Sequence, residues 1–159
     1  MLSSLTINNV VLIDSLSLKG EQGLCALTGE TGAGKSILLD ALGLAIGERA
    51  ESRLVRAGEE KATVTATFDL SPQHNVFKIL KEYDIDNEDS TIILRRTLSQ
   101  DGRSKAFIND TPISVQLLKD IGANLVEING QFSSYGLLNS TTHLMLIDEY
   151  AEHSDKVIK

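Results

Sequence analysis

The residues that could do chemistry are concentrated in one short stretch, positions 29–36, which reads Gly-Glu-Thr-Gly-Ala-Gly-Lys-Ser. Its spacing is the G-x-x-x-x-G-K-[ST] pattern of a phosphate-binding loop. Backbone N–H groups can wrap a triphosphate only where side chains leave room, which is the physical reason for the three glycines. Lys35 is expected to reach the β- and γ-phosphates as a point charge, and the Ser36 hydroxyl to ligate the Mg²⁺ that bridges them. The stretch therefore predicts a site for a nucleoside triphosphate and Mg²⁺.

The residues on either side of this stretch supply the elements that must position it. Residues 24–28 form an apolar run that predicts a buried strand, and Cys25 within it is interpreted as a small core residue. Residues 37–46 predict a helix that ends near Gly47, a residue type suited to a C-terminal cap. A helix that begins near Lys35 points the positive end of its dipole at bound phosphates. The residues predicted to contact the nucleotide are Gly29, Glu30, Thr31, Gly32, Ala33, Gly34, Lys35, Ser36 and Ile37.

Composition narrows the class of protein. The 159 residues are 42% hydrophobic and 23% charged, as in an ordinary globular chain long enough for one domain with a core. The net charge of −7 argues against a surface dedicated to coating DNA, although it allows local basic spots. A single cysteine permits no internal disulfide and favours a reducing compartment. We find no signal peptide and no apolar run of membrane-spanning length, so we expect a cytoplasmic protein.

The rest of the chain alternates short strands with helices. Polar and glycine-rich turns separate them, such as Gln100-Asp101-Gly102 between two strands. Ser114 is expected to open a helix. The predicted strands cover residues 2–10, 12–18, 62–68, 91–98, 103–109 and 125–128, and the predicted helices cover residues 76–83, 114–121 and 142–159. This order predicts an α/β fold in which a mixed core sheet carries the phosphate loop and its helix, with an antiparallel β sub-layer beside it.

Several stretches are similar to a known family, in colinear order over nearly the whole chain. Residues 5–14 resemble the opening of SMC-type and RecF-type ATPase heads. Residues 29–42, 47–62 and 101–109 are very similar to bacterial RecN, the SMC-like DNA repair ATPases. The resemblance is more specific than the phosphate loop, which names only a superfamily.

The resemblance implies a P-loop NTPase fold and a function. Residues 1–159 would be the N-terminal lobe of an ABC/SMC-type ATPase head, with residues 140–159 starting the arm toward a coiled coil. Such a head binds ATP and Mg²⁺ and acts in DNA double-strand break repair and recombination. ATP would be sandwiched between two heads, so the implied partners are the C-terminal half of the same head, a second head, and DNA in the full-length assembly. A cytoplasmic, nucleoid-associated protein is expected.

The resemblance also assigns residues near the end of the chain. Gln131 matches the glutamine that contacts Mg²⁺ and the attacking water in related heads, so Lys35 and Gln131 are the predicted catalytic residues. This sequence has Asn129 and Phe132 where the family pattern leads us to expect histidines, which leaves the roles of these two positions open. Arg56 either approaches the nucleotide phosphates or is simply solvated.

Parts of an ABC-type head are absent from the sequence. There is no Leu-Ser-Gly-Gly signature. Residues 144–149 end in Asp148-Glu149 and mimic the strand that carries the magnesium aspartate and the general base. We interpret them as helical, because only one of the four apolar residues is β-branched and a threonine that suits a helix cap precedes them. We therefore expect little ATPase activity from this chain alone.

Two other function classes fit the phosphate loop. A self-contained kinase or switch GTPase would need its own strand-end aspartate, and the Asn-Lys-x-Asp that specifies guanine is absent. A folded lobe that docks to partners could use nucleotide as a structural ligand only. The histidines, His74, His143 and His153, are scattered and do not suggest a metal site.

Overall fold

The computed structural model describes residues 1–28, 33–87 and 89–128, with only the backbone of residue 33. The chain divides into two units, Met1–Val126 and Glu127–Lys159. The described residues of the second unit are Glu127 and Ile128, which form neither helix nor strand.

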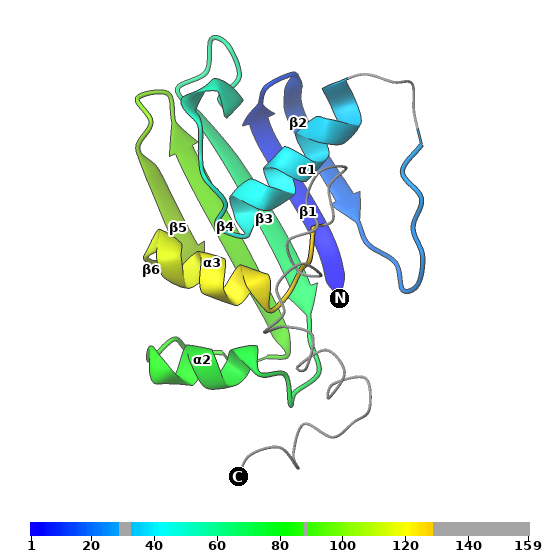
Figure 1. Ribbon diagram of the computed structural model, residues 1–159, viewed down its shortest axis with the longest axis vertical. Helices are drawn as coiled ribbons and strands as arrows, with labels where there is room; N and C mark the ends of the chain where they lie inside the picture. Colours follow the sequence, from blue (N-terminus) through cyan, green and yellow to red (C-terminus); the bar gives the residue numbers. More distant parts are fainter. Residues whose placement is uncertain (29–32, 88, 129–159) are drawn as a thin grey trace, which may run out of the picture. The chain divides into compact units, whose positions relative to one another are not determined.

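The first unit is built on a six-stranded antiparallel sheet with the order β2-β1-β3-β4-β5-β6 (Figure 1). Neighbours in the sheet are mostly neighbours in sequence, so short turns make most of the connections. The strands are β1 (Leu2–Val10), β2 (Ile13–Lys19), β3 (Lys61–Asp69), β4 (Thr91–Ser99), β5 (Ser104–Ile108) and β6 (Thr111–Ile113).

The alternation of residue types along the strands decides which face of the sheet is buried. In β3 the residues at even positions, such as Val64 and Phe68, are almost fully buried, whereas Thr63, Thr65 and Thr67 remain half-buried. Successive side chains of a strand point to opposite faces, so one face of the sheet is apolar and the other carries hydroxyl groups.

Two helices cover the apolar face (Figure 1). α1 (Ala33–Ala45) contacts β1, β3 and β4, and α3 (Val115–Ala123) contacts β5. Ser114 caps α3, because its hydroxyl accepts a hydrogen bond of 3.1 Å from the backbone N–H of Leu117. The remaining helical elements are α2 (Val76–Glu82) and a 3₁₀ turn, η1 (Ser52–Leu54).

Glycines allow the end of α1 to touch α3 directly. Gly47 has a φ of 95°, and a Cβ added to it would lie 2.5 Å from the backbone nitrogen of Lys119. A Cβ added to Gly122 would lie 2.3 Å from the carbonyl oxygen of Ile46. Real Cβ atoms do not approach backbone so closely, so both positions require glycine for the two helices to pack as they do.

One charged side chain lies in this apolar core. Arg96, in the middle of β4, is 2% exposed and pairs across the sheet with Val64 and Ala106. Its Nη2 donates to the Ser104 hydroxyl at 2.9 Å, whereas its Nε and Nη1 have no hydrogen-bond partner among the described residues. Burial lowers the pKa of the Arg96 guanidinium, because the charged form loses its hydration.

Most of the predicted elements are confirmed, with small shifts at their ends. The helix expected from position 76 is α2, the 62–68 strand is β3, and the hairpin at residues 99–103 closes with Gly102 at a φ of 84°. At this hairpin, hydrogen bonds from Arg103 lower the pKa of Asp101. Between the predicted strand at residues 103–109 and the predicted helix at residues 114–121, the structure has an additional short strand, β6, which begins at Thr111.

Two predicted core strands are wrong. Residues 24–28 form no strand, and Leu24, Cys25 and Leu27 are exposed. Residues 125–128 form a turn followed by irregular backbone. A strand needs a neighbour to satisfy its N–H and C=O groups, and the six strands of the described sheet use one another as partners. Apolar content alone therefore does not make either segment a strand in this chain.

Candidate nucleotide-binding site

Helix α1 begins inside the phosphate-loop sequence. Its first turn contains Gly34, Lys35 and Ser36, so the predicted lysine and serine lie where the backbone N–H groups of a helix have no intrahelical acceptors. Gly34 and Ser36 are exposed, and Lys35 is half-buried. A Cβ added to Gly34 would meet nothing within 4 Å among the described residues, which leave open space at the start of the helix. The N–H donors and positive dipole end of a helix N-terminus, a hydroxyl and an ammonium group are what phosphate and Mg²⁺ require.

The second turn of α1 anchors this helix start to the sheet. Ile37 is 5% exposed, and Ala41, Leu44 and Ala45 follow it on the buried stripe of the helix. Ile37 was predicted to contact the nucleotide, and its side chain lies in the core. The buried side chain fixes the direction of α1, and hence the positions of Lys35 and Ser36, whereas a contact between Ile37 and the nucleotide stays a prediction.

Several predicted site residues lie outside the described residues. They are the loop residues Gly29, Glu30, Thr31 and Gly32, the catalytic candidate Gln131 with its neighbours Asn129 and Phe132, and Asp148 and Glu149. The side chain of Ala33 is also outside the described part. The structure thus brings together the C-terminal half of the predicted loop, and the roles of the other residues stay predictions.

Arg56 makes hydrogen bonds to the tip of the β1–β2 hairpin. Its Nη1 donates to the carbonyl oxygen of Leu12 at 2.8 Å, and its backbone N–H donates to the Asn9 carbonyl at 2.9 Å. The hairpin tip is unusual, because Asn9 and Val11 both have positive φ values, of 56° and 48°. Arg56 and its hydrogen bonds therefore hold a strained turn in place, which is a structural use for this side chain.

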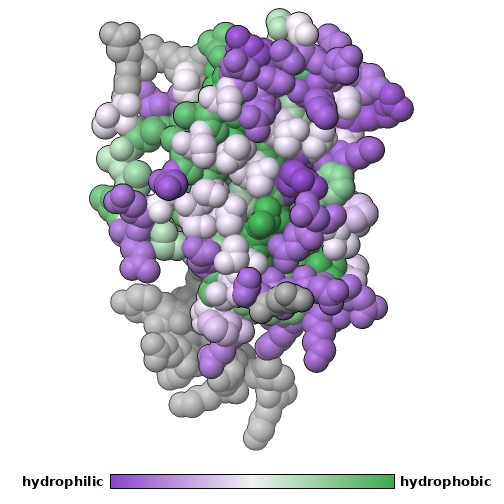
Figure 2. All heavy atoms as spheres, turned by 180° about the vertical axis from the view of Figure 1, so that it is seen from behind, coloured by the Kyte–Doolittle hydropathy of each residue, from purple (hydrophilic) through white to green (hydrophobic). Residues whose placement is uncertain are grey.

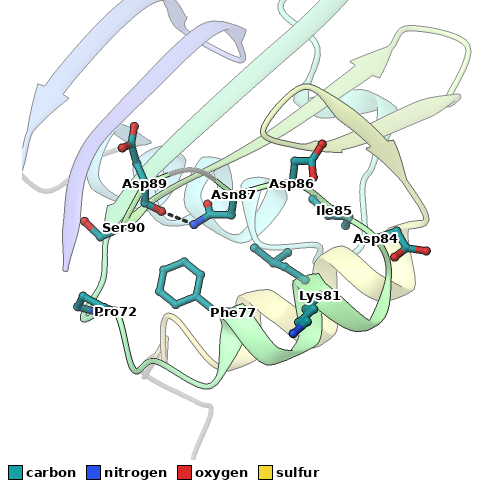
Figure 3. A pocket seen from close by; sticks show the side chains of 10 residues that line it. Pro72, Phe77, Lys81, Asp84, Ile85, Asp86, Asn87, Asp89 and Ser90 are labelled. Atoms are coloured by element: carbon teal, nitrogen blue, oxygen red, sulfur yellow. Dashed lines mark hydrogen bonds between the residues drawn. The ribbon is translucent and has the colours of Figure 1, made fainter.

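A cavity of about 710 Å³ lies away from the phosphate-loop residues, between α2 and the loop that leads to β4 (Figure 3). Phe77 points into it from α2, and the Asn87 amide donates to the carbonyl oxygen of Asp89. Three carboxylates and one lysine supply its charged lining groups: Lys81, Asp84, Asp86 and Asp89. This excess of negative charge would repel a triphosphate, so size alone does not make this cavity the nucleotide site.

The described residues do not offer other chemistry. Within residues 1–28, 33–87 and 89–128, no group of three or more His, Cys, Asp or Glu side chains could hold a metal ion. No helix in the same ranges is long and apolar enough to cross a membrane. The start of α1 is therefore the candidate site.

A family comparison identifies the class of domain. The family described as AAA domain matches residues 4–152. The chain belongs to this AAA domain family. Among curated proteins, it is 46% identical to the DNA repair protein RecN of Haemophilus influenzae over 161 aligned residues. That match covers 100% of this chain and 29% of the relative, so the chain spans less than a third of the relative's length.

Solved structures show the fold of this AAA domain. An Smc head domain with a coiled coil and joint from Pyrococcus yayanosii superposes with a TM-score of 0.66 and 20% identity, covering 98% of this chain and 33% of that one. A structure from work on ATP-driven dimerization and DNA-stimulated activation of SMC ATPases gives a TM-score of 0.63 and 20% identity, covering 94% of this chain and 98% of that one. The domain therefore has the α/β fold of SMC ATPase heads, as the sequence predicted.

Two features of the strands follow from the alternation of their residues. Arg96 lies at an even position of β4 between Leu94 and Leu98, a position that predicts a buried side chain. Lys61 and Lys105 lie at outward positions of their strands. Counting residues in steps of two from a known buried position would have found both.

Proposed function

We propose that this chain is the ATP-binding N-terminal half of a RecN-type ATPase head that acts in DNA double-strand break repair and recombination. The observation that carries the proposal is the start of α1 within the phosphate-loop sequence, with Gly34, Lys35 and Ser36 in its first turn beside open space. The 46% identity to a protein named for DNA repair and the fold shared with SMC ATPases support the choice among phosphate-loop functions.

In this proposal the protein supplies charge and geometry at the phosphates. The first-turn N–H groups and the loop glycines would hold the phosphate oxygens, and Lys35 would offset their negative charge. Ser36 would be a Mg²⁺ ligand, and the ion would contribute the charge that stabilises the β- and γ-phosphates during transfer. Gln131 would contact the ion and the attacking water, as the family resemblance implies.

The head would be completed by polypeptide outside this chain. Leu24, Leu27 and Leu39 are exposed, the last two to 54% and 51%, and residues 24–28 have no strand partner among the described residues. Large exposed apolar side chains are typical of surfaces that another part of a protein covers. We infer that the C-terminal half of the head adds strands here and brings the general base, so residues 148–149 are not the catalytic pair.

The proposed partners follow from this incompleteness. Residues 1–159 would form one lobe, with about residues 140–159 leading toward a coiled coil. Two complete heads would sandwich ATP, by analogy with the SMC ATPases described as dimerizing when driven by ATP. DNA would be engaged by the full-length assembly, which we expect in the cytoplasm at the nucleoid.

Reconstitution tests the proposed function. The chain alone, and the chain mixed with the separately expressed C-terminal half of the same head, are assayed for Mg²⁺-dependent ATP hydrolysis. We expect activity at or near background for the chain alone and a clear increase in the mixture. The increase should disappear with Lys35→Ala and persist with Lys119→Ala, a matched change of an exposed lysine on α3.

Two results would contradict the proposal. Robust turnover by the chain alone, abolished by Glu149→Gln, would mean that the base lies within this chain. Preference for GTP, or transfer of phosphate to a small molecule, would indicate a different phosphate-loop enzyme.

A further inference from the structure

One face of the six-stranded sheet is not covered by α1 or α3, which lie on the other face (Figure 1). We call it the open face. Figure 2 views the molecule from this side, where a central area of mostly intermediate hydropathy is bordered at the top and on the right by hydrophilic side chains. One row of paired residues crosses all six strands on the open face, in the order Ser17, Thr6, Thr65, Arg95, Phe107 and Pro112.

The charge on the open face is opposite to the charge of the chain. The whole sequence carries −7, yet the outward positions of the strands include Lys19, Lys61 and Lys105, all exposed. Two exposed acidic residues of the described strands, Asp69 and Asp14, lie near strand ends, Asp69 at the end of β3 and Asp14 at the hairpin end of β2. Since the strands hold these side chains a fixed distance apart, the positive charges are a feature of the fold and not of a mobile tail.

Arg95 adds a positioned cation at the centre of this face. Its guanidinium lies 4.6 Å from the centroid of the Phe107 ring, and its Nη2 is 2.7 Å from a carboxylate oxygen of Asp110. The Arg95 side chain is 37% exposed, so the stacked pair is accessible. Because Asp110 already offsets much of its charge, Arg95 contributes a flat, oriented donor more than net charge, and the three lysines supply the net charge.

The hydroxyl groups complete the surface. Thr63, Thr65, Thr67 and Thr97 line the centre of the face, half-buried on neighbouring strands. Two of them, Thr63 and Thr97, have their hydroxyl oxygens 3.5 Å apart across the strands. Short hydroxyl side chains, lysines and an arginine are the groups that contact phosphate and sugar in protein–DNA interfaces.

We propose that the open face binds the phosphate backbone of DNA. The six strands span about 24 Å across the sheet, at about 4.8 Å per strand, which corresponds to roughly seven base pairs at about 3.4 Å each. Lys61 and Lys105 lie two strands apart, about 10 Å, and Lys19 lies on the far side of the row. The choice of DNA among polyanions rests on the proposed function in DNA repair. The positive charge of the open face is observed independently of that function.

Charge reversal at two of the lysines tests the proposal. Lys61→Glu with Lys105→Glu changes the open face, and Lys78→Glu with Lys119→Glu makes the same change of net charge on helices α2 and α3. Binding to a fluorescein-labelled 20-base-pair duplex and to one of its single strands is measured by anisotropy at several salt concentrations from about 25 to 150 mM. We expect the open-face variant to bind the duplex at least about ten-fold more weakly, with a salt slope reduced by about 2.

The outcomes separate this inference from the proposed function. The helix variant should bind DNA within about two-fold of the unchanged chain after allowance for its net charge, and the open-face variant should keep its affinity for MgATP. Equal weakening by both pairs of substitutions, or no DNA binding by the unchanged chain at the lowest salt, would overturn the inference. Loss of affinity for the single strand alone would overturn its assignment to duplex backbone. Absence of ATP binding with retained open-face DNA binding would instead contradict the proposed function.

Discussion

A substitution at Gly34 can separate the affinity for MgATP from the stability of the fold. This glycine is in the first turn of α1, is exposed, and a Cβ added to it would meet no atom of residues 1–28, 33–87 and 89–128 within 4 Å. Gly34→Ala should therefore leave the fold intact and raise the free energy of unfolding by about 0.5–1 kcal/mol, since alanine favours helix. The same methyl group would occupy the space proposed for the phosphates, so the affinity for MgATP should fall at least about ten-fold.

Urea unfolding followed by circular dichroism, together with titration of a fluorescent ATP analogue, checks both parts of this prediction. An Ala variant that binds ATP as tightly as the unchanged chain would show that the phosphates do not approach Gly34.

Arg96 gives a second prediction at the scale of one residue. It is 2% exposed, its Nε and Nη1 lack partners in the part of the chain that the structure describes, and burial lowers its pKa. A buried charge without a counter-ion is costly, so Arg96→Met, which keeps much of the volume, should raise the free energy of unfolding by about 1–3 kcal/mol. Arg103→Met, at a side chain that is 87% exposed, is the control and should change stability by less than about 1 kcal/mol. Destabilisation by Arg96→Met would mean that the guanidinium has a stabilising partner in solution.

At the scale of elements, close packing between the end of α1 and α3 helps to hold in place the helix that carries the candidate site. Gly122→Ala would place a methyl group 2.3 Å from the Ile46 carbonyl oxygen, and the two helices would have to separate. We expect a loss of about 1–3 kcal/mol in the free energy of unfolding, as for overpacked cores. Lys119→Ala on the same helix should have an effect below about 0.5 kcal/mol, because this side chain is exposed. Equal unfolding midpoints for Gly122→Ala and the unchanged chain in a urea titration would contradict the packing.

The elements that sequence alone predicted well are those whose pattern and partners are both local. In β3, apolar residues alternate with threonine. The hairpin at residues 99–103 contains its own turn residues, and Ser114 caps the helix that follows it. Residues 24–28 have the composition of a buried strand, but a strand also needs a neighbour, and no sequence pattern within the segment can supply one. The same reason explains the irregular backbone at residues 126–128.

The candidate site was predictable from sequence in its chemistry and less so in its geometry. The pattern at residues 29–36 identified Lys35 and Ser36, and the structure places both in the first turn of α1. The burial of Ile37 and the occupation of Arg56 by the hairpin carbonyl of Leu12 depend on tertiary contacts. Spacing along the chain carries no information about such contacts.

At the scale of the whole molecule, the exposed apolar residues predict where a further part of the head would add. If the C-terminal half pairs with residues 24–28, their backbone N–H groups should become hydrogen-bonded. We expect amide hydrogen exchange at Ala26 and Leu27 to slow by at least about 100-fold when the C-terminal half is added, whereas the 99–103 hairpin should be unchanged. Unaltered exchange in a mixture that hydrolyses ATP would show that the halves join elsewhere.

The central claim is that the start of α1 binds the phosphates of ATP. Isothermal titration calorimetry of the 159-residue chain with ATP tests this claim most directly. We predict Mg²⁺-dependent binding that Lys35→Ala weakens at least about ten-fold, with the fold retained by circular dichroism and with Lys78→Ala, an exposed lysine on α2, unchanged. Equal ATP affinity for Lys35→Ala and the unchanged chain, or no ATP binding by either, would contradict the claim.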